Sequence, residues 1–256
     1  MSVHNAISTN WINTHAKLIQ DAPLVIIDAN ISEEAMKATF DLCLQYDKPV
    51  FFEPTDMRFA AKPFNASDNA CKVIRFITPN LYELREIAKN LGFKEQPIAN
   101  TLIENFSELD DLLQEVRTLG SFTVNHVDNV IVTLGYYGVV IIRRACEQVP
   151  FFDSTETYQR RVADKPQTRF YPGRKLDYIV NVSGAGDSFS SGFIAAMLGG
   201  RLEAVCVEVG FEAACCALTS KGAVAELYFG RSHPCWDETN GARFITIEQS
   251  EQFSLK

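Results

Sequence analysis

The sequence of 256 residues lacks several patterns that mark particular classes of protein. It has seven cysteines but no Cys-x-x-Cys pair, and its four histidines show no ligand spacing, which argues against a structural metal site and against a disulfide framework. It has no long run of basic residues, and its formal charge of −8 disfavours nucleic acid or an anionic membrane as the partner. A small molecule is the expected ligand.

Long hydrophobic runs and targeting patterns are also missing. The longest apolar stretch, VIVTLGYYGVVII, is interrupted by two glycines and is too short to span a bilayer. The first residues show neither a basic start followed by an apolar stretch nor an arginine-rich amphipathic pattern. Together with the unpaired cysteines, this favours reduced thiols and a cytoplasmic location.

Short apolar runs alternate with helical patterns along the chain. Buried strands are predicted where Val, Ile and Phe gather between Asp, Asn, Pro or Gly, as in APLVIIDAN, KPVFFEPTD, KVIRFITPN and NVIVTLG. Helices are predicted between them in SEEAMKATFDLCLQYD, LYELREIAKNLGF and SELDDLLQEVRTLG. This alternation indicates a mostly parallel central sheet with helices on both faces.

The length suits one large α/β domain over residues 1–256. Residues 147–174 break the alternation, because they are polar, contain three prolines and lack a helical stripe. They predict a hairpin arm or a long surface loop. The tail from about 228 to 256 has no interpretable pattern.

The stretch VNVSGAGDSF places small residues and then Asp187 directly before a helical pattern. The backbone amides of Gly184, Ala185 and Gly186 are then expected at a helix N-terminus without intrahelical partners, which suits an anion such as phosphate. A carboxylate beside a phosphate is repelled unless it has another task, and the task that fits is to accept the proton of a hydroxyl that attacks the phosphate. The alternative is a glycine-rich turn in which Asp187 is an ordinary helix cap.

Three further stretches have structural explanations on their residues alone. In ITPNLYELREIA, Asn80 and Glu83 have the spacing of a helix capping box. In VIVTLGYYGVVII, the glycines suit a tight turn between two buried strands. In LVIIDAN, Asp28 and Asn30 suit the turn that follows a strand.

Taken together and in this order, these stretches resemble the motifs of the PfkB, or ribokinase-like, family of small-molecule kinases. NVSGAGDSFSSGF resembles the C-terminal signature, ITPNLYELREIA the Asn-x-x-Glu element, and VIVTLGYYGVVII the hairpin that lies along the nucleotide. The resemblance covers residues from about 7 to 225 and implies a three-layer α/β/α ribokinase-like fold. Asn181 and Val182 at the start of the signature, with LVIIDAN and FFEPTD, resemble the pseudouridine-kinase branch and its fused glycosidase-kinase relatives.

The resemblance implies a role for each matching residue. The implied catalytic base is Asp187, and the implied anion hole consists of the amides of Gly184, Ala185 and Gly186. The remaining implied roles are contacts to ATP from Thr133 and Gly135, the hairpin turn at Gly138, water-mediated binding of Mg²⁺ and phosphates by Asn80 and Glu83, and contacts of Asp28 and Asn30 with the sugar or base. ATP and Mg²⁺ are the implied cofactors, with a monovalent cation as an optional addition.

The opening part of the family pattern has no counterpart in this sequence. Family members begin with a strand that carries a substrate-binding Asp, a Gly-Gly element and a small β-lid, whereas ISTNWINTHAKLIQDAPLVII resembles the segment after the lid. We therefore expect an N-terminally truncated fold with an exposed sheet edge, covered by a second copy of the chain or by the missing N-terminal segment.

Three functions compete at this point. The first is ATP-dependent phosphorylation of a sugar or nucleoside, with pseudouridine as the favoured acceptor and ribose or adenosine as alternatives. The second is a non-catalytic nucleotide-binding or partner-binding fragment. The third, a Rossmann-type dehydrogenase, is disfavoured because no Gly-x-Gly-x-x-Gly follows the first strand.

Overall fold

The computed structural model describes residues 6–94, 103, 108–160 and 165–248. They are organised around one seven-stranded sheet whose spatial order follows the chain from β1 to β7. The first four strands are parallel, and the last three extend the sheet in antiparallel fashion. The strands are β1 Val25–Asp28, β2 Val50–Glu53, β3 Ile74–Ile77, β4 Asn129–Thr133, β5 Gly138–Arg143, β6 Gln167–Pro172 and β7 Ile245–Thr246.

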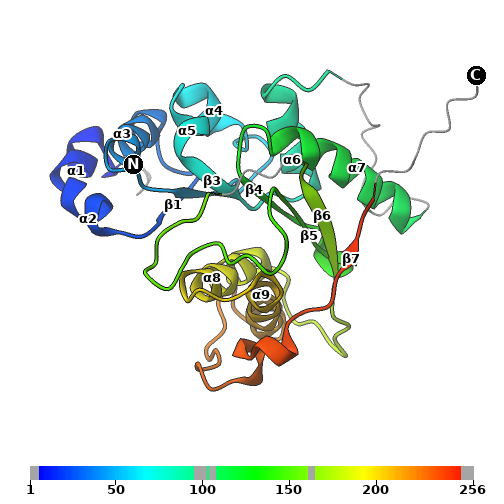
Figure 1. Ribbon diagram of the computed structural model, residues 1–256. Coiled ribbons are helices and arrows are strands. Elements are labelled where there is room, and N and C mark those ends of the chain that lie inside the picture. Colours follow the sequence, from blue (N-terminus) through cyan, green and yellow to red (C-terminus); the bar gives the residue numbers. More distant parts are fainter. Residues whose placement is uncertain (1–5, 95–102, 104–107, 161–164, 249–256) are drawn as a thin grey trace, which may run out of the picture.

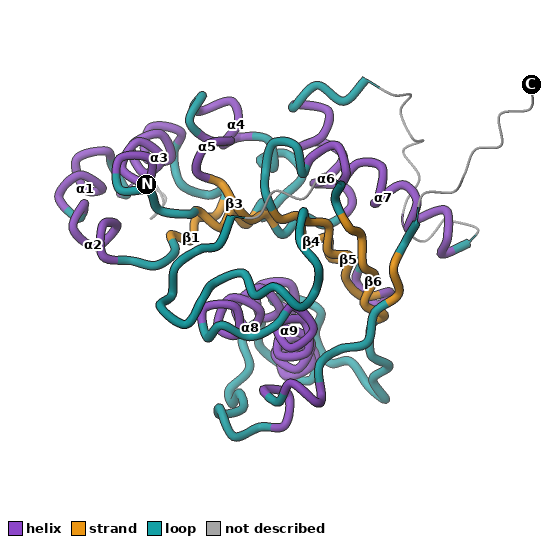
Figure 2. The backbone as a smooth tube through the Cα atoms, viewed as in Figure 1, coloured by secondary structure: helices purple, strands orange, loops and turns teal. Residues whose placement is uncertain are grey.

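Helices cover both faces of this sheet, so the predicted three-layer α/β/α architecture is confirmed (Figure 1). One layer contains α3 to α7, with α1 and α2 beside α3 near β1, and the other contains α8 and α9. Figure 2 shows the strands as one layer between the two sets of helices. The helices are α1 Thr9–Thr14, α2 Ala16–Asp21, α3 Glu33–Gln45, α4 Lys62–Ala66, α5 Ala70–Val73, α6 Leu81–Asn90, α7 Leu109–Thr123, α8 Ala185–Leu198 and α9 Glu203–Leu218, with short 3₁₀ turns η3 Gly135–Tyr137, η4 Pro234–Trp236 and η5 Glu238–Asn240.

The central strands contribute to two hydrophobic cores at once. In β2, Phe52 packs in the core beneath α3 to α7, whereas its neighbour Phe51 packs in the core beneath α8 and α9. Val130 and Ile131 of β4 divide in the same way, because successive side chains of a strand point to opposite faces. Since both faces are covered, the strands appear in the sequence as continuous apolar runs.

Local signals account for the helix boundaries. The hydroxyl of Ser32 accepts a hydrogen bond from the amide of Ala35 at the start of α3. Gly92, with φ of 99°, follows the end of α6 and stops the helix in the left-handed conformation that favours glycine. Among the apolar positions predicted for α3, Met36 and Phe40 are fully buried.

The prediction that residues 147–174 form a hairpin arm or a long surface loop is confirmed only in part, because the segment also contains the strand β6. Phe151 and Phe152 are buried beneath the sheet, and β6 pairs with β5 along its whole length. The strand escaped prediction because its middle residue, Arg169, looks solvent-exposed by residue type but is buried against Glu203 of α9. A small hairpin does occur, since Phe152 and Tyr158 form an isolated antiparallel bridge.

The tail and the sheet edges complete the description. Ile245 and Thr246 form β7 and pair with β6, so part of the tail belongs to the sheet. At the other end of the strand order lies β1, where Ile26 is 55% exposed. All seven cysteines are free. Of the helices within the described ranges, none combines the length and the apolar character needed to cross a membrane.

Candidate functional site

The carboxyl ends of three parallel strands meet the N-terminus of α8 at a polar cavity. In open α/β sheets this edge is the usual place for ligands. The cavity has a volume of about 230 Å³. Residues from β2, β3 and β4 ends, α6 and α8 line it: Glu53, Thr55, Thr78, Asn80, Glu83, Thr133, Gly184, Gly186, Asp187 and Ser190. Most of the residues singled out in the sequence are thus brought together from positions far apart in the chain.

Helix α8 begins inside the glycine-rich loop. Gly184 is its N-cap, with φ of 76°, and the first hydrogen bond of the helix runs from the amide of Ser188 to Gly184 O at 2.9 Å. The amides of Gly186 and Asp187 precede that bond and therefore have no intrahelical acceptor. The amide of Ala185 lies 3.5 Å from Val182 O, and Ala185 is not among the residues that line the cavity.

The N-cap position excludes the simpler explanation of Asp187. An ordinary capping aspartate occupies the N-cap and accepts an amide with its side chain. Here Gly184 holds that position, and no side chain caps the helix. Asp187 lies three residues further on and lines the cavity instead. Its carboxylate is available for another role.

Substitutions at the two glycines of this loop should have opposite effects on stability. A Cβ on Gly184 would lie 1.9 Å from Ala223 O, and φ there is positive, so Gly184→Ala should lower the free energy of unfolding by about 2 kcal/mol or more. A Cβ on Gly186 meets nothing within 4 Å, so Gly186→Ala should be neutral or raise it by about 0.5 kcal/mol. Urea unfolding of both variants checks this. Equal destabilisation would contradict the described path of the loop.

Asn80 and Glu83 form the predicted capping box at the start of α6. The amide of Asn80 donates to Glu83 Oε2 at 2.8 Å, and the amide of Glu83 donates to Asn80 Oδ1 at 3.0 Å. Glu83 is 4% exposed, and burial raises its pKa. Its Oε2 is used by the cap, and Glu83 also lines the polar cavity.

These two residues fit a magnesium ion held through water and phosphate better than one held directly. Within the described parts of the chain, no group of three or more His, Cys, Asp or Glu side chains is arranged to hold a metal ion. Mg²⁺ usually keeps several waters and binds through one or two carboxylates and substrate phosphates. The single carboxylate of Glu83 on the wall of this polar cavity matches that mode of binding.

Thr133 and the two hairpin glycines are placed differently. Thr133 lines the cavity, and its amide donates to Pro79 O at 2.9 Å, next to Asn80. Gly135 and Gly138 belong to the turn between β4 and β5 and are not among the lining residues described. Gly138 has φ of 122°, and a Cβ there would lie 2.1 Å from Tyr171 O, so the turn requires glycine at this position.

Glu53 is a site residue that sequence reasoning did not identify. It ends β2, and its Oε2 accepts hydrogen bonds from Thr78 Oγ1 and, at 3.1 Å, from Ser190 Oγ. Burial, with a smaller contribution from the carboxylates of Glu83 and Asp187, raises the pKa of Glu53 to about 7, against the hydrogen bonds from Thr78 and Ser190. The available signal was a glutamate at the end of an otherwise apolar strand, in VFFEP.

The raised pKa of Glu53 predicts a pH dependence of stability. Because the folded protein binds this proton more tightly than the unfolded chain, whose pKa is near 4.5, stability is full below pH 4.5 and falls as pH rises through about 7. Between pH 4.5 and 8, the free energy of unfolding of the wild type should fall by about 2 to 3 kcal/mol relative to that of Glu53→Gln. Urea unfolding of both proteins across this pH range measures the difference in unfolding free energy. The titration of Glu83 is common to both proteins and cancels in this difference. A constant difference would contradict the raised pKa of Glu53.

A second, larger cavity opens next to the polar one. It has a volume of about 840 Å³ and runs along β1 between α1, α2 and α8. Most of its walls are apolar, including Trp11, Ile26 and Ile194. Three residues line both this groove and the polar cavity: Glu53, Asp187 and Ser190. Asp187 therefore lies where the two spaces meet.

The two weakest sequence assignments lie at this groove. Asp28 lines it, whereas Asn30 is not among its described lining residues. The amide and side chain of Asn30 donate to the Asp28 carboxylate at 3.0 and 2.9 Å. This is the strand-end turn that the sequence allowed as an alternative, and it leaves contact with a ligand untested.

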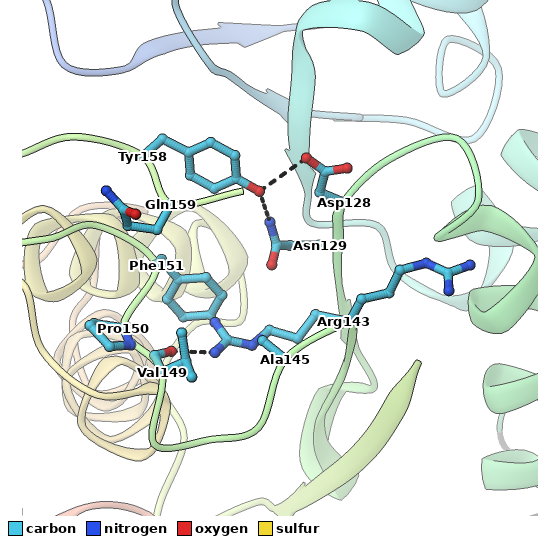
Figure 3. Close-up of a pocket in the computed structure, with 10 residues that line it drawn as sticks. Asp128, Asn129, Arg143, Ala145, Val149, Pro150, Phe151, Tyr158 and Gln159 are labelled. Carbon is cyan, nitrogen blue, oxygen red and sulfur yellow. Dashed lines mark hydrogen bonds between the residues drawn. The ribbon is translucent and has the colours of Figure 1, made fainter. Parts of the chain in front are cut away.

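A third cavity lies at the opposite edge of the sheet and involves none of the predicted residues (Figure 3). Its volume of about 10 Å³ is the size of a single water molecule. Tyr158 links its walls, because its hydroxyl donates to Asp128 Oδ2 at 3.1 Å and accepts from Asn129 Nδ2 at 3.0 Å. Arg143 lies over the ring of Phe151 on the other side. This cluster is structural in character.

Comparisons with known proteins identify the family and the fold. The family model described as "pfkB family carbohydrate kinase" matches residues 3–227. Pseudouridine kinase from Arabidopsis thaliana is 24% identical over 276 residues, covering 97% of this chain and 71% of that protein.

Solved structures show the same fold at low sequence identity. Adenosine kinase from Schistosoma mansoni, in complex with 2-fluoroadenosine, superposes with a TM-score of 0.60 at 17% identity over 86% of this chain. Arabidopsis thaliana ribokinase, complexed with ribose and ATP, superposes with a TM-score of 0.55 at 17% identity over 83% of this chain. The chain spans 58% and 56% of the lengths of these two proteins.

Proposed function

Because this chain belongs to the pfkB family of carbohydrate kinases, we propose that it transfers the γ-phosphoryl group of ATP to a hydroxyl group of a sugar or nucleoside. The observation that carries this proposal is the position of Asp187. It lies between a polar cavity at a helix N-terminus, which suits the phosphates, and a larger groove, which suits the acceptor. A base for phosphoryl transfer needs access to both substrates.

In the proposed mechanism, Asp187 accepts the proton of the attacking hydroxyl as the new P–O bond forms and the bond to ADP breaks. The amides at the start of α8, from Gly184 and Gly186, donate hydrogen bonds to the transferred phosphoryl group. ATP lies along the β4–β5 hairpin, near Thr133, Gly135 and Gly138. Asn80 and Glu83 would hold Mg²⁺ through water, and this ion, optionally with a monovalent cation, would supply positive charge against the phosphates.

The acceptor that we propose is pseudouridine, which would be converted to pseudouridine 5′-phosphate. The support is the 24% identity to a pseudouridine kinase over 97% of this chain. Asp28, on the groove wall, and Asn30 beside it are the proposed contacts to the sugar or base. Ribose and adenosine are the alternative acceptors.

The free cysteines favour a reducing compartment such as the cytoplasm.

An acceptor series tests the assignment. ADP release from Mg-ATP is measured with pseudouridine, uridine, adenosine and ribose at equal concentrations. Pseudouridine carries a ring N–H that uridine lacks, so kcat/KM for pseudouridine should exceed that for uridine by roughly 100-fold or more. A higher kcat/KM for ribose or adenosine would contradict pseudouridine as the acceptor but would still support the kinase assignment.

The competing function is a nucleotide-binding module without transferase activity. The chain spans 56–58% of the lengths of the two solved kinases described above. The competing function predicts ATP binding without any acceptor-dependent ADP release. In either case we propose that a second copy or a further strand covers the edge at β1, where Ile26 is exposed.

A further inference from the structure

We propose that Glu53 is a positioning residue for Asp187, acting through Ser190 to hold the first turns of α8 against the ends of β2 and β3. The inference rests on the proposed function for its kinetic consequences. Its structural content is independent of that function. Neither the capping residues of α6 nor the glycine-rich loop provides this connection.

The connection is made by one carboxylate oxygen. Glu53 Oε2 accepts the hydroxyl of Thr78, just after β3, and the hydroxyl of Ser190, on α8, the latter at 3.1 Å. Both donors are buried, at 3% and 7% exposure. Three elements of the structure are therefore joined at a single acceptor on the wall of the polar cavity.

Apart from the core packing of Phe189 and Phe193, the start of α8 has few described side-chain hydrogen bonds. Its N-cap is Gly184 and carries no side chain, and the residues that follow, Ala185 and Gly186, are small. Ser188 is not among the lining residues of either cavity, and its hydroxyl contacts the hydroxyl of Tyr228 at 3.0 Å. The contact from Ser190 to Glu53 is thus the described side-chain bond that ties this turn to the sheet.

Ser190 is well placed to set the direction of Asp187. Residues three apart on a helix are neighbours on one face. Asp187 and Ser190 have this spacing, and both line the polar cavity and the groove. Fixing Ser190 against Glu53 fixes the rotation of the helix about its axis, and so keeps Asp187 at the junction of the two spaces.

The surrounding charges explain why the carboxylate of Glu53 accepts hydrogen bonds from two hydroxyl groups. Glu53 faces Asp187 of α8 and Glu83 of α6, and these carboxylates repel it. A proposed ATP phosphate would add to that repulsion. Hydroxyl donors from Thr78 and Ser190 stabilise the carboxylate without adding a positive charge that would compete with Asp187.

A double-mutant cycle tests the positioning role. The variants are Glu53→Ala, Ser190→Ala, their combination and Glu53→Gln, with Glu86→Gln on the outer part of α6 as a matched control. Each alanine variant should lower kcat by roughly tenfold or more with KM for ATP within about threefold. The combined variant should be no worse than the stronger single variant.

The conservative variant separates positioning from charge. The amide oxygen of Gln can accept both hydroxyls, so Glu53→Gln should keep kcat within about threefold of the wild type, as should Glu86→Gln. Independent, multiplying losses in the combined variant would overturn the proposal. So would loss of folding stability with unchanged kcat in the folded fraction.

Amide hydrogen exchange tests the positioning role of Glu53 without a measurement of activity. In Glu53→Ala and Ser190→Ala, the Ser188 amide, which closes the first turn of α8, should exchange with solvent roughly tenfold faster, while amides near Met197 keep wild-type rates. Unchanged exchange at Ser188 overturns the proposal. If the wild type transfers no phosphate but Ser188 exchange responds as stated, the proposed function fails and the positioning role of Glu53 stands.

Discussion

Asp187→Asn is expected to lower kcat for acceptor phosphorylation by roughly 1,000-fold, because an amide cannot take the proton of the attacking hydroxyl. Binding of Mg-ATP should stay within about threefold, since the helix amides and the hairpin are unchanged. Steady-state kinetics, with nucleotide affinity from isothermal titration calorimetry, measures both quantities.

A second aspartate provides the control for this substitution. Asp177 is exposed and precedes the glycine-rich loop, so Asp177→Asn makes the same chemical change nearby. It should keep kcat within about twofold. If Asp187→Asn retained an activity comparable to that of Asp177→Asn, another group would be the base. The junction of the two cavities would then not be the proposed site of phosphoryl transfer.

Glu203→Ala is expected to cause the largest loss of stability, about 3 to 5 kcal/mol, with a fall in the melting temperature of roughly 10 °C. Glu203 is fully buried, and its carboxylate accepts Arg169 Nε at 2.5 Å and the Tyr171 hydroxyl at 2.7 Å. Arg143 Nε lies 3.0 Å away, and burial lowers the pKa of Arg143. Removing Glu203 leaves two buried guanidinium groups without their counter-charge.

A partly exposed ion pair on the same helix gives the comparison. Glu212 pairs with Arg174 at 2.7 Å and is 25% exposed, so Glu212→Ala should cost no more than about 1 kcal/mol. Urea unfolding of both variants compares the two. A similar small loss for Glu203→Ala would show that the buried cluster does not hold α9 to β5 and β6.

The parts of the molecule that could be predicted are those specified by residues close in sequence. The apolar runs of β2 and β4 indicated buried strands because helices cover both faces. Asn80 and Glu83 were recognised as a capping box because its spacing is only three residues. The loop before Asp187 was recognised as a helix start because small residues precede an apolar helical stripe.

The parts that escaped prediction depend on residues far apart in the chain. Glu53 and Ser190 are 137 positions apart, and the role that we propose for them depends on the hydrogen bond between them. Arg169 and Glu203, 34 positions apart, similarly turn a polar-looking segment into the buried strand β6. A single sequence carries no signal for such pairings, since each residue alone is typical of a surface.

The most direct test of the account is a ³¹P NMR spectrum of the chain with Mg-ATP and pseudouridine. The account predicts that the γ-phosphate resonance of ATP declines as one new phosphomonoester resonance, coupled to the 5′ protons of the sugar, grows in equal amount. ATP that binds without turnover, or that yields only ADP and inorganic phosphate, would contradict the proposal that Asp187 directs phosphoryl transfer to an acceptor hydroxyl.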